Sequence, residues 1–286
     1  MTAPRIDRIR CDNPSPMTLQ GTITHVLGGA RQVVIVDPGP ADHPEHREAV
    51  AAAVAGREVS TILVTHRHGD HTGAAAEFAR RFDAPVRGAD PSWCLAAGGG
   101  HDDGHDGARG PSGAVDAVDA PAPLTDGERL AVDGAALVVI PTPGHTSDSV
   151  SFWIPDDPSD VDGAGGGAML TGDTVLGAGT TMLDHPDGTL TDYLASLERL
   201  RAHGAARLLP AHGPERESLA AVVDDYLAHR RERLDQVRGL LAAHGQDLDA
   251  VALGRLIYGE DSGLPAGVTT KIAAAQLDHL HRIGER

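Results

Sequence analysis

Residues 65–73 constrain this chain more than any other stretch, because they hold three histidines and one aspartate within six positions. These four residues are His66, His68, Asp70 and His71. The apolar run 61–64 precedes them and the helix-like run 74–82 follows, so they lie in a tight loop between an expected strand and an expected helix. Such a loop can direct all four side chains into one cavity. Because imidazole and carboxylate groups bind divalent metal ions, the stretch predicts a metal pocket; the alternative is a solvated, histidine-rich loop.

Three later residues repeat this arrangement, in which an apolar run ends at a polar residue followed by a turn. They are His145, Asp173 and His212. Each of them alone fits ordinary turn chemistry, but the shared context favours one metal site built together with the first cluster. Five neutral imidazoles and two carboxylates around two divalent ions leave a net charge of about +2, so a water shared by the ions loses a proton readily near neutral pH.

Two further segments have more than one interpretation. Asp37 ends the expected strand 32–37, where it either fixes the orientation of an imidazole or forms a turn before Pro38. Residues 98–113 combine histidines and aspartates with many glycines. We expect a floppy polar insertion there rather than a second metal site, because ordering so many glycines opposes binding. The insertion could also act as a lid.

Composition limits the class of protein and its partners. The 286 residues suit one large domain with a small appendage, and the net charge of −17 repels polyanions, so we expect no duplex DNA partner. The chain has no apolar run of membrane-spanning length and no apolar segment of a secretory signal near residue 1. Two distant cysteines imply no disulfide framework. We therefore expect a cytoplasmic protein without a membrane partner; assembly with identical chains stays open.

The C-terminal part of the chain is expected to be helical. Residues 214–245 keep one apolar face of a long helix, and two shorter helical patterns follow. We expect a catalytic domain over residues 1–213, a long connecting helix over 214–245 and a small C-terminal domain over 246–286.

The pattern His-x-His-x-Asp-His at residues 66–71 resembles the signature of the metallo-β-lactamase fold. A finer resemblance to the lactamase-beta-2-like subgroup covers almost the whole chain. It is carried by residues 13–22, 171–181, 212–214 and 226–230. The resemblance implies an α/β fold, an αββα sandwich of two mixed sheets faced by helices, with a small winged-helix-like appendage at the C-terminus. The chain departs from the subgroup at Ile23 and His25, where Asn and Tyr are usual, and this departure bears on substrate preference.

The resemblance also implies how the metals are shared. One ion is held by His66, His68 and His145, the second by Asp70, His71 and His212, and Asp173 bridges the two. Asp70 could additionally orient the shared hydroxide or carry its proton. A histidine-dominated shell suits Zn²⁺, and a mixed shell also accepts Mn²⁺ or Fe. The spacing selects no group to protonate the leaving group; the candidates are Ser147, Asp148, Asp184 and His185.

The first functional hypothesis is a binuclear metal-dependent phosphodiesterase, an endoribonuclease that cleaves single-stranded RNA through a metal-bridging hydroxide. An animal member of the subgroup has this activity, and a positive metal centre suits an anionic diester. The acidic chain, without a basic and aromatic platform for single strands, opposes it. The alternative is a small-molecule acyl hydrolase of thioesters or lactones with the same metal centre.

Two other classes fit less well. A non-catalytic binding protein would have lost a ligand, whereas all seven residues are present. Oxygen reduction at a di-iron centre would call for a flavin-binding partner domain, for which the sequence shows no pattern.

Overall fold

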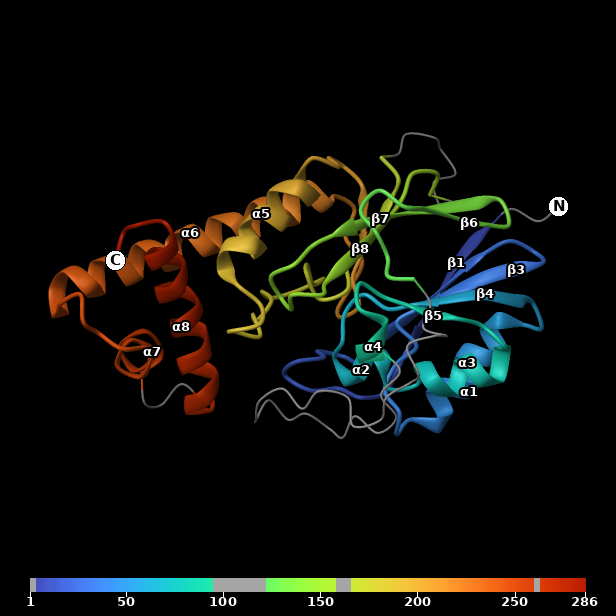
Figure 1. The fold of residues 1–286 in the computed structure, drawn as a ribbon, viewed down its shortest axis with the longest axis horizontal. Helices are drawn as coiled ribbons and strands as arrows, with labels where there is room; N and C mark the ends of the chain where they lie inside the picture. Colours follow the sequence, from blue (N-terminus) through green and yellow to red (C-terminus); the bar gives the residue numbers. More distant parts are fainter. Residues whose placement is uncertain (1–3, 95–121, 158–165, 260–262) are drawn as a thin grey trace.

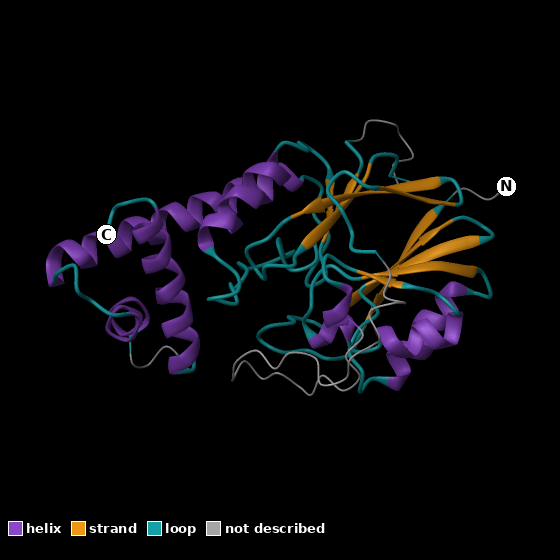
Figure 2. Cartoon of the chain, in the orientation of Figure 1, coloured by secondary structure: helices purple, strands orange, loops and turns teal. Residues whose placement is uncertain are grey.

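Two stacked sheets with helices on their outer faces form the body of the protein in the computed structural model (Figure 1, Figure 2). The described residues are 4–94, 122–157, 166–259 and 263–286. The Gly-rich insertion expected at residues 98–113 lies outside these ranges. In the part of the chain that is described, no helix has the length and apolarity to cross a bilayer.

Each sheet is mixed and has five strands. In order across the first sheet these are β1 (Arg5–Arg10), β2 (Ile23–Gly28), β3 (Gln32–Val36), β4 (Glu58–Leu63) and β5 (Val86–Arg87). Across the second they are β10 (Arg207–Leu209), β9 (Ala168–Leu170), β8 (Val150–Ile154), β7 (Ala135–Pro141) and β6 (Arg129–Val132). The pairs β3–β4, β4–β5 and β9–β10 are parallel, and the other neighbours are antiparallel.

Almost every residue of β2, β3, β8 and β9 is buried, and the alternation along β3 shows how the layers pack. On β3, Val34 and Val36 point into the core between the sheets, where Phe152 and Leu209 meet them. The intervening Val33 and Ile35 belong to a separate core on the outer face of the first sheet. In the sequence such strands are continuous apolar runs. The predicted metal ligands lie where these runs end.

Helices cover both outer faces. On the first sheet lie α1 (Pro44–Val54) and α3 (Ala75–Phe82), and the short α2 (Gly69–Thr72) and α4 (Pro91–Cys94) lie nearby (Figure 1). On the second sheet lies α5 (Leu190–Arg201), packed against the long α6 (Leu219–His244). The predicted αββα sandwich is confirmed.

The C-terminal part is helical, as predicted, and consists of α6, α7 (Ala250–Tyr258) and α8 (Ala266–Arg282). One apolar cluster joins buried residues of α5, α6 and α8, so these helices share a core with the second sheet. Residues 246–259 and 263–286 contain no strand that would form the wing of a winged helix. The proposed domain limits at residues 213 and 245 stay predictions.

The start of the long helix was predicted too early. It begins at Leu219 rather than at Pro214, because Arg216 forms two backbone hydrogen bonds with Leu208 of β10, of 2.8 and 3.1 Å. The hydroxyl of Ser218 then accepts a hydrogen bond from the amide of Ala221 and caps the helix. Strand β1 was not predicted at all; it pairs with β2 along the edge of the first sheet.

Candidate metal centre

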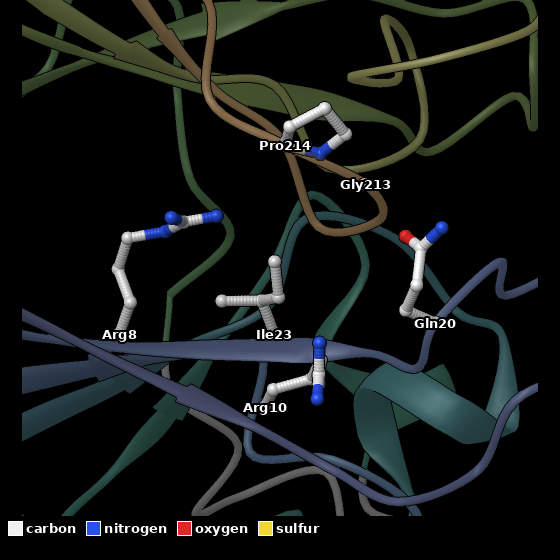
Figure 3. Close-up of a pocket in the computed structure, with 6 residues that line it drawn as sticks. All are labelled: Arg8, Arg10, Gln20, Ile23, Gly213 and Pro214. Atoms are coloured by element: carbon white, nitrogen blue, oxygen red, sulfur yellow. The ribbon is translucent and has the colours of Figure 1, made fainter.

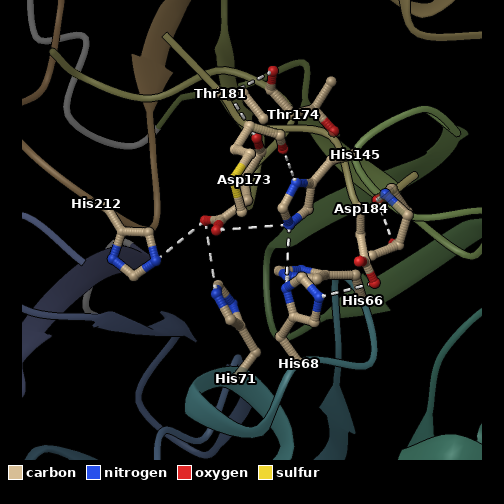
Figure 4. A network of polar contacts seen from close by, with 12 residues as sticks. His66, His68, His71, His145, Asp173, Thr174, Thr181, Asp184 and His212 are labelled. Carbon is tan, nitrogen blue, oxygen red and sulfur yellow. Dashed lines mark hydrogen bonds and ion pairs between the residues drawn. The ribbon is translucent and has the colours of Figure 1, made fainter. Parts of the chain in front are cut away.

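All seven predicted ligand residues meet at one edge of the sandwich, where four strand ends and one short helix converge. Figure 4 labels these residues except Asp70. His66 and His68 follow β4, and Asp70 and His71 lie on α2. His145 follows β7, Asp173 follows β9, and His212 follows β10. The donor atoms form three overlapping groups, in each of which they lie within 4.8 Å of one another.

One group consists of three imidazoles, from His66, His68 and His145. The Nδ1 atom of His68 lies 3.0 Å from Nε2 of His66 and 3.1 Å from Nε2 of His145. A second group contains carboxylates, from Asp70 and Asp173. Nε2 of His212 lies 3.3 Å from Asp70 Oδ2 and 3.2 Å from Asp173 Oδ1, and Nε2 of His71 lies at similar distances from the same two oxygens.

Asp173 lies between the two groups. Its Oδ1 faces His71 and His212, while its Oδ2 lies 3.8 Å from Nε2 of His145. A carboxylate with one oxygen toward each group has the geometry that a bridge between two ions requires.

The scaffold fixes the imidazoles from behind. Nδ1 of His71 donates to Oδ2 of the buried Asp37 over 2.9 Å, and Nδ1 of His145 donates to the carbonyl of Met182 over 2.6 Å. The Thr65 hydroxyl donates to Asp37 over 2.9 Å, so it can accept from Nδ1 of His66 at 3.1 Å. Asp37 thus supports an imidazole, which was one of its two predicted roles.

This arrangement fits a divalent cation. When the outer nitrogens carry the protons, the inner nitrogens present lone pairs to one another at 3.0 and 3.1 Å, which is repulsive without a positive charge between them. Nε2 of His71 and Oδ1 of Asp173 are also buried without a hydrogen-bond partner. Orphaned donor atoms that converge in this way are what a metal ion would satisfy.

The two groups differ in their affinity for protons. Burial, together with the neighbouring imidazoles, holds the pKa of His66 well below its usual range, and burial lowers the pKa of His145 to about 4. Burial opposes a charge on His212, but the Asp173 and Asp70 carboxylates together outweigh it and raise the pKa of His212 to about 9. His66 and His145 are therefore neutral and ready for a metal, whereas His212 holds a proton in the metal-free protein.

Comparison with known proteins agrees with this geometry. A family model described as the metallo-beta-lactamase superfamily matches residues 18–212, which is more than half of the chain. The chain belongs to the metallo-β-lactamase superfamily. Its seven clustered donors therefore make it a superfamily hydrolase with a site compatible with divalent metal ions.

Two relatives and one solved structure illustrate the similarity. The chain is 30% identical over 261 residues to the beta-lactamase-like protein 2 homolog of Caenorhabditis elegans, covering 89% of this chain and 77% of the relative. It is 28% identical to a protein of a Cryptosporiopsis species named atrochrysone carboxyl ACP thioesterase, covering 88% and 68%. A beta-lactamase domain protein from Burkholderia ambifaria shares the fold, with a TM-score of 0.73 at 22% identity, over 98% of this chain and 87% of the other.

Sequence reasoning missed a threonine that holds Asp70. The Thr22 hydroxyl donates to Asp70 Oδ2 over 2.9 Å and accepts from the side-chain amide of Asn13 over 3.0 Å. Residues 13–22 were noted only as part of the subgroup resemblance. In the structure, Asn13 and Thr22 at the two ends of this segment orient the carboxylate of Asp70.

Sequence reasoning also missed a charged network behind His68, although Asp184 itself was a candidate proton donor. Asp184 Oδ2 lies 3.6 Å from Nε2 of His68 and 3.2 Å from Nη2 of Arg67, while its Oδ1 lies 3.0 Å from Nζ of Lys271 on α8. Hydrogen bonding to His68, aided by Lys271, holds the pKa of Asp184 well below its usual range. Asp184 is therefore an ionised support for His68 and not a proton donor.

The other candidate proton donors differ from one another. The Ser147 hydroxyl donates a hydrogen bond to Asp187 over 2.8 Å. Burial lowers the pKa of His185. Asp148 is different, because burial raises its pKa and its Oδ1 is buried without a partner. Of the four candidates, Asp148 is the carboxyl group best able to hold a proton.

The protonation of the carboxylate group predicts a pH-dependent metal affinity. Below about pH 9 the metal-free protein holds a proton on His212 that a metal ion must displace. Metal binding should therefore release protons, and the affinity of the second ion should fall as the pH is lowered from about 9 to about 6. Competition titrations with a chromophoric chelator across this pH range measure the affinity of the second ion. An affinity that does not change with pH would contradict the assignment.

The network behind His68 predicts that α8 affects metal binding. Replacing Asp184 by Asn removes the negative charge beside His68 and should weaken binding of the first ion about tenfold or more. Lys271→Met should also weaken binding of the first ion. The matched control is Asp278→Asn, on α8, where the carboxylate pairs only with Arg282 among the described ion pairs. Chelator competition and the absorption spectrum of bound Co²⁺ are the readouts; wild-type affinity in Asp184→Asn would refute the role.

Proposed function

We propose that this chain hydrolyses acyl thioesters with two divalent ions. Zn²⁺ is the ion that its imidazole-rich donors suit. The observation that carries the proposal is the relationship to a carrier-protein thioesterase over 88% of the chain. The donor set supports it, because the seven residues include no cysteine and one carboxylate lies between the two groups.

Bound ions would supply a nucleophile at neutral pH and neutralise negative charge that develops on the carbonyl oxygen. The chain's own residues then have separate tasks. Thr22 and Asn13 orient Asp70, whose proposed task is to accept a proton from the attacking water. Asp37, Thr65 and the carbonyl of Met182 hold the imidazoles in one orientation, so the donor cluster is organised before substrate arrives.

Hydrolysis of a thioester also needs little acid catalysis from the protein. A thiol has a pKa of about 8.5, so the leaving group departs as a thiolate without a proton donor. Asp184, which lies beside His68 at the centre, is held ionised and cannot donate one. The negative chain does not hinder a small thioester, whereas it repels a long polyanion.

The second candidate function is cleavage of single-stranded RNA. It is supported by the resemblance of the sequence to the lactamase-beta-2-like subgroup, an animal member of which cleaves single-stranded RNA, and by the burial of Asp148, which raises the pKa of this carboxyl group and so favours its protonated form. The net charge of −17 opposes it, so we place it second.

The test offers metal-replete protein a panel of acyl thioesters and lactones and, separately, a labelled single-stranded RNA at low salt. We expect thioester hydrolysis that falls below about one hundredth of the wild-type rate in Asp173→Ala, with lower metal content and an unchanged circular dichroism spectrum. The control is Asp133→Ala. Asp133 lies on the β6–β7 turn, where its carboxylate pairs with Arg31. Cleavage of RNA without thioester hydrolysis would replace the proposal by the second candidate.

A further inference from the structure

A buried arginine of the long helix α6 has no carboxylate partner. Arg230 is 8% exposed, and none of the ion pairs between described residues includes it. Its Nε atom is also buried without a hydrogen-bond partner. Moving a guanidinium group out of water costs free energy, so its remaining contacts have to compensate for that cost. Those contacts indicate what this arginine does.

Two contacts hold the guanidinium group of Arg230. Its Nη2 atom donates a hydrogen bond to the backbone carbonyl of Thr181, and its Cζ atom lies 5.0 Å from the centre of the Tyr193 ring. A charged donor forms a stronger hydrogen bond than a neutral one, and the face of an aromatic ring attracts a cation. Arg230 therefore ties α6 to the loop at Thr181 and to Tyr193 of α5.

The loop formed by residues 181–184 supports two of the candidate metal ligands (Figure 4). The hydroxyl of Thr181 donates a hydrogen bond to the backbone carbonyl of Asp173 over 2.8 Å. The carbonyl of Met182 accepts one from Nδ1 of His145 over 2.6 Å. A shift of this loop would therefore move the carboxylate between the two groups and the imidazole of His145 together.

The other end of the same loop supports a third ligand. The amide of Asp184 donates to the carbonyl of His145 over 2.9 Å, and the Asp184 carboxylate lies 3.6 Å from Nε2 of His68. Leu183 is 4% exposed and packs in the apolar cluster with α5 and α6. The loop therefore rests on these helices through an apolar side chain, and Arg230 holds its backbone.

We propose that Arg230 is a positioning residue of the metal centre. It holds the loop 181–184 from α6, and the loop sets the positions of His68, His145 and Asp173. An apolar side chain could not replace the arginine, because it has no donor for the carbonyl of the loop. The inference concerns the metal centre and does not depend on which substrate is hydrolysed.

The test measures metal binding in Arg230→Met, which removes the guanidinium group and keeps most of the aliphatic stem. The matched control is Arg231→Met, at the next residue of α6, where the exposed side chain lies 3.7 Å from Glu198. Competition with a chromophoric chelator should show binding of the first ion about tenfold weaker in Arg230→Met and unchanged in Arg231→Met. The visible absorption spectrum of bound Co²⁺ should change in Arg230→Met alone.

A role of Arg230 in stability alone predicts a different result. The free energy of unfolding would fall, while metal affinity and the Co²⁺ spectrum, both measured well below the unfolding temperature, would match the wild type. That result would overturn the proposal. A wild type that binds neither Zn²⁺ nor Co²⁺ would overturn it together with the metal centre.

The route through the loop is tested with Thr181→Val, which removes the hydrogen bond to Asp173. Because both variants loosen the same loop, the loss of metal affinity in the double variant with Arg230→Met should be smaller than the sum of the two single losses. Additive losses would overturn the route through the loop.

A further variant decides if Arg230→Met does not fold. Arg230→Lys keeps the charge but replaces the planar guanidinium group by a compact ammonium group. It should weaken binding of the first ion by less than about tenfold and still alter the Co²⁺ spectrum. Wild-type affinity and an unchanged spectrum in folded Arg230→Lys would then overturn the proposal.

Discussion

The structure depends on the way the imidazoles are tied to the scaffold from behind. The Nδ1 atoms of three rings each donate a hydrogen bond to the scaffold. His71 donates to a carboxylate, His66 to a hydroxyl and His145 to a backbone carbonyl. Each ring then presents a lone pair inward, and these lone pairs converge at distances that are repulsive unless a cation lies among them. Gly172, at φ 51°, allows the close approach behind this set, because a Cβ there would lie 2.5 Å from the Thr65 hydroxyl oxygen. Repulsion between the close donor atoms therefore raises the free energy of the folded chain, and a divalent ion would remove this repulsion.

The sandwich makes this convergence possible. Its central strands, such as β3 and β9, are buried on both faces, so each is held by two cores and the residues that follow it have a fixed position. The turn formed by Gly213 and Pro214 directly follows His212 and also lines a cavity (Figure 3).

Much of this could be predicted from the sequence, because the signals are local. The apolar runs that end in His145, Asp173 and His212 are short, and the His66–His71 cluster is contiguous. The rest depends on contacts between distant residues. Lys271 meets Asp184 across 87 positions and Thr22 meets Asp70 across 48, and neither pair has a local pattern. Strand β1 was missed because Ile6 and Ile9 stand three apart, which breaks the alternation typical of a strand.

The central claim is that seven residues of this chain hold two divalent ions. Elemental analysis of the purified protein, after dialysis against metal-free buffer that removes loosely bound ions, tests it most directly. We predict two ions per chain. A protein that folds normally but, after loading with excess metal and the same dialysis, retains no ion or only one would contradict the account.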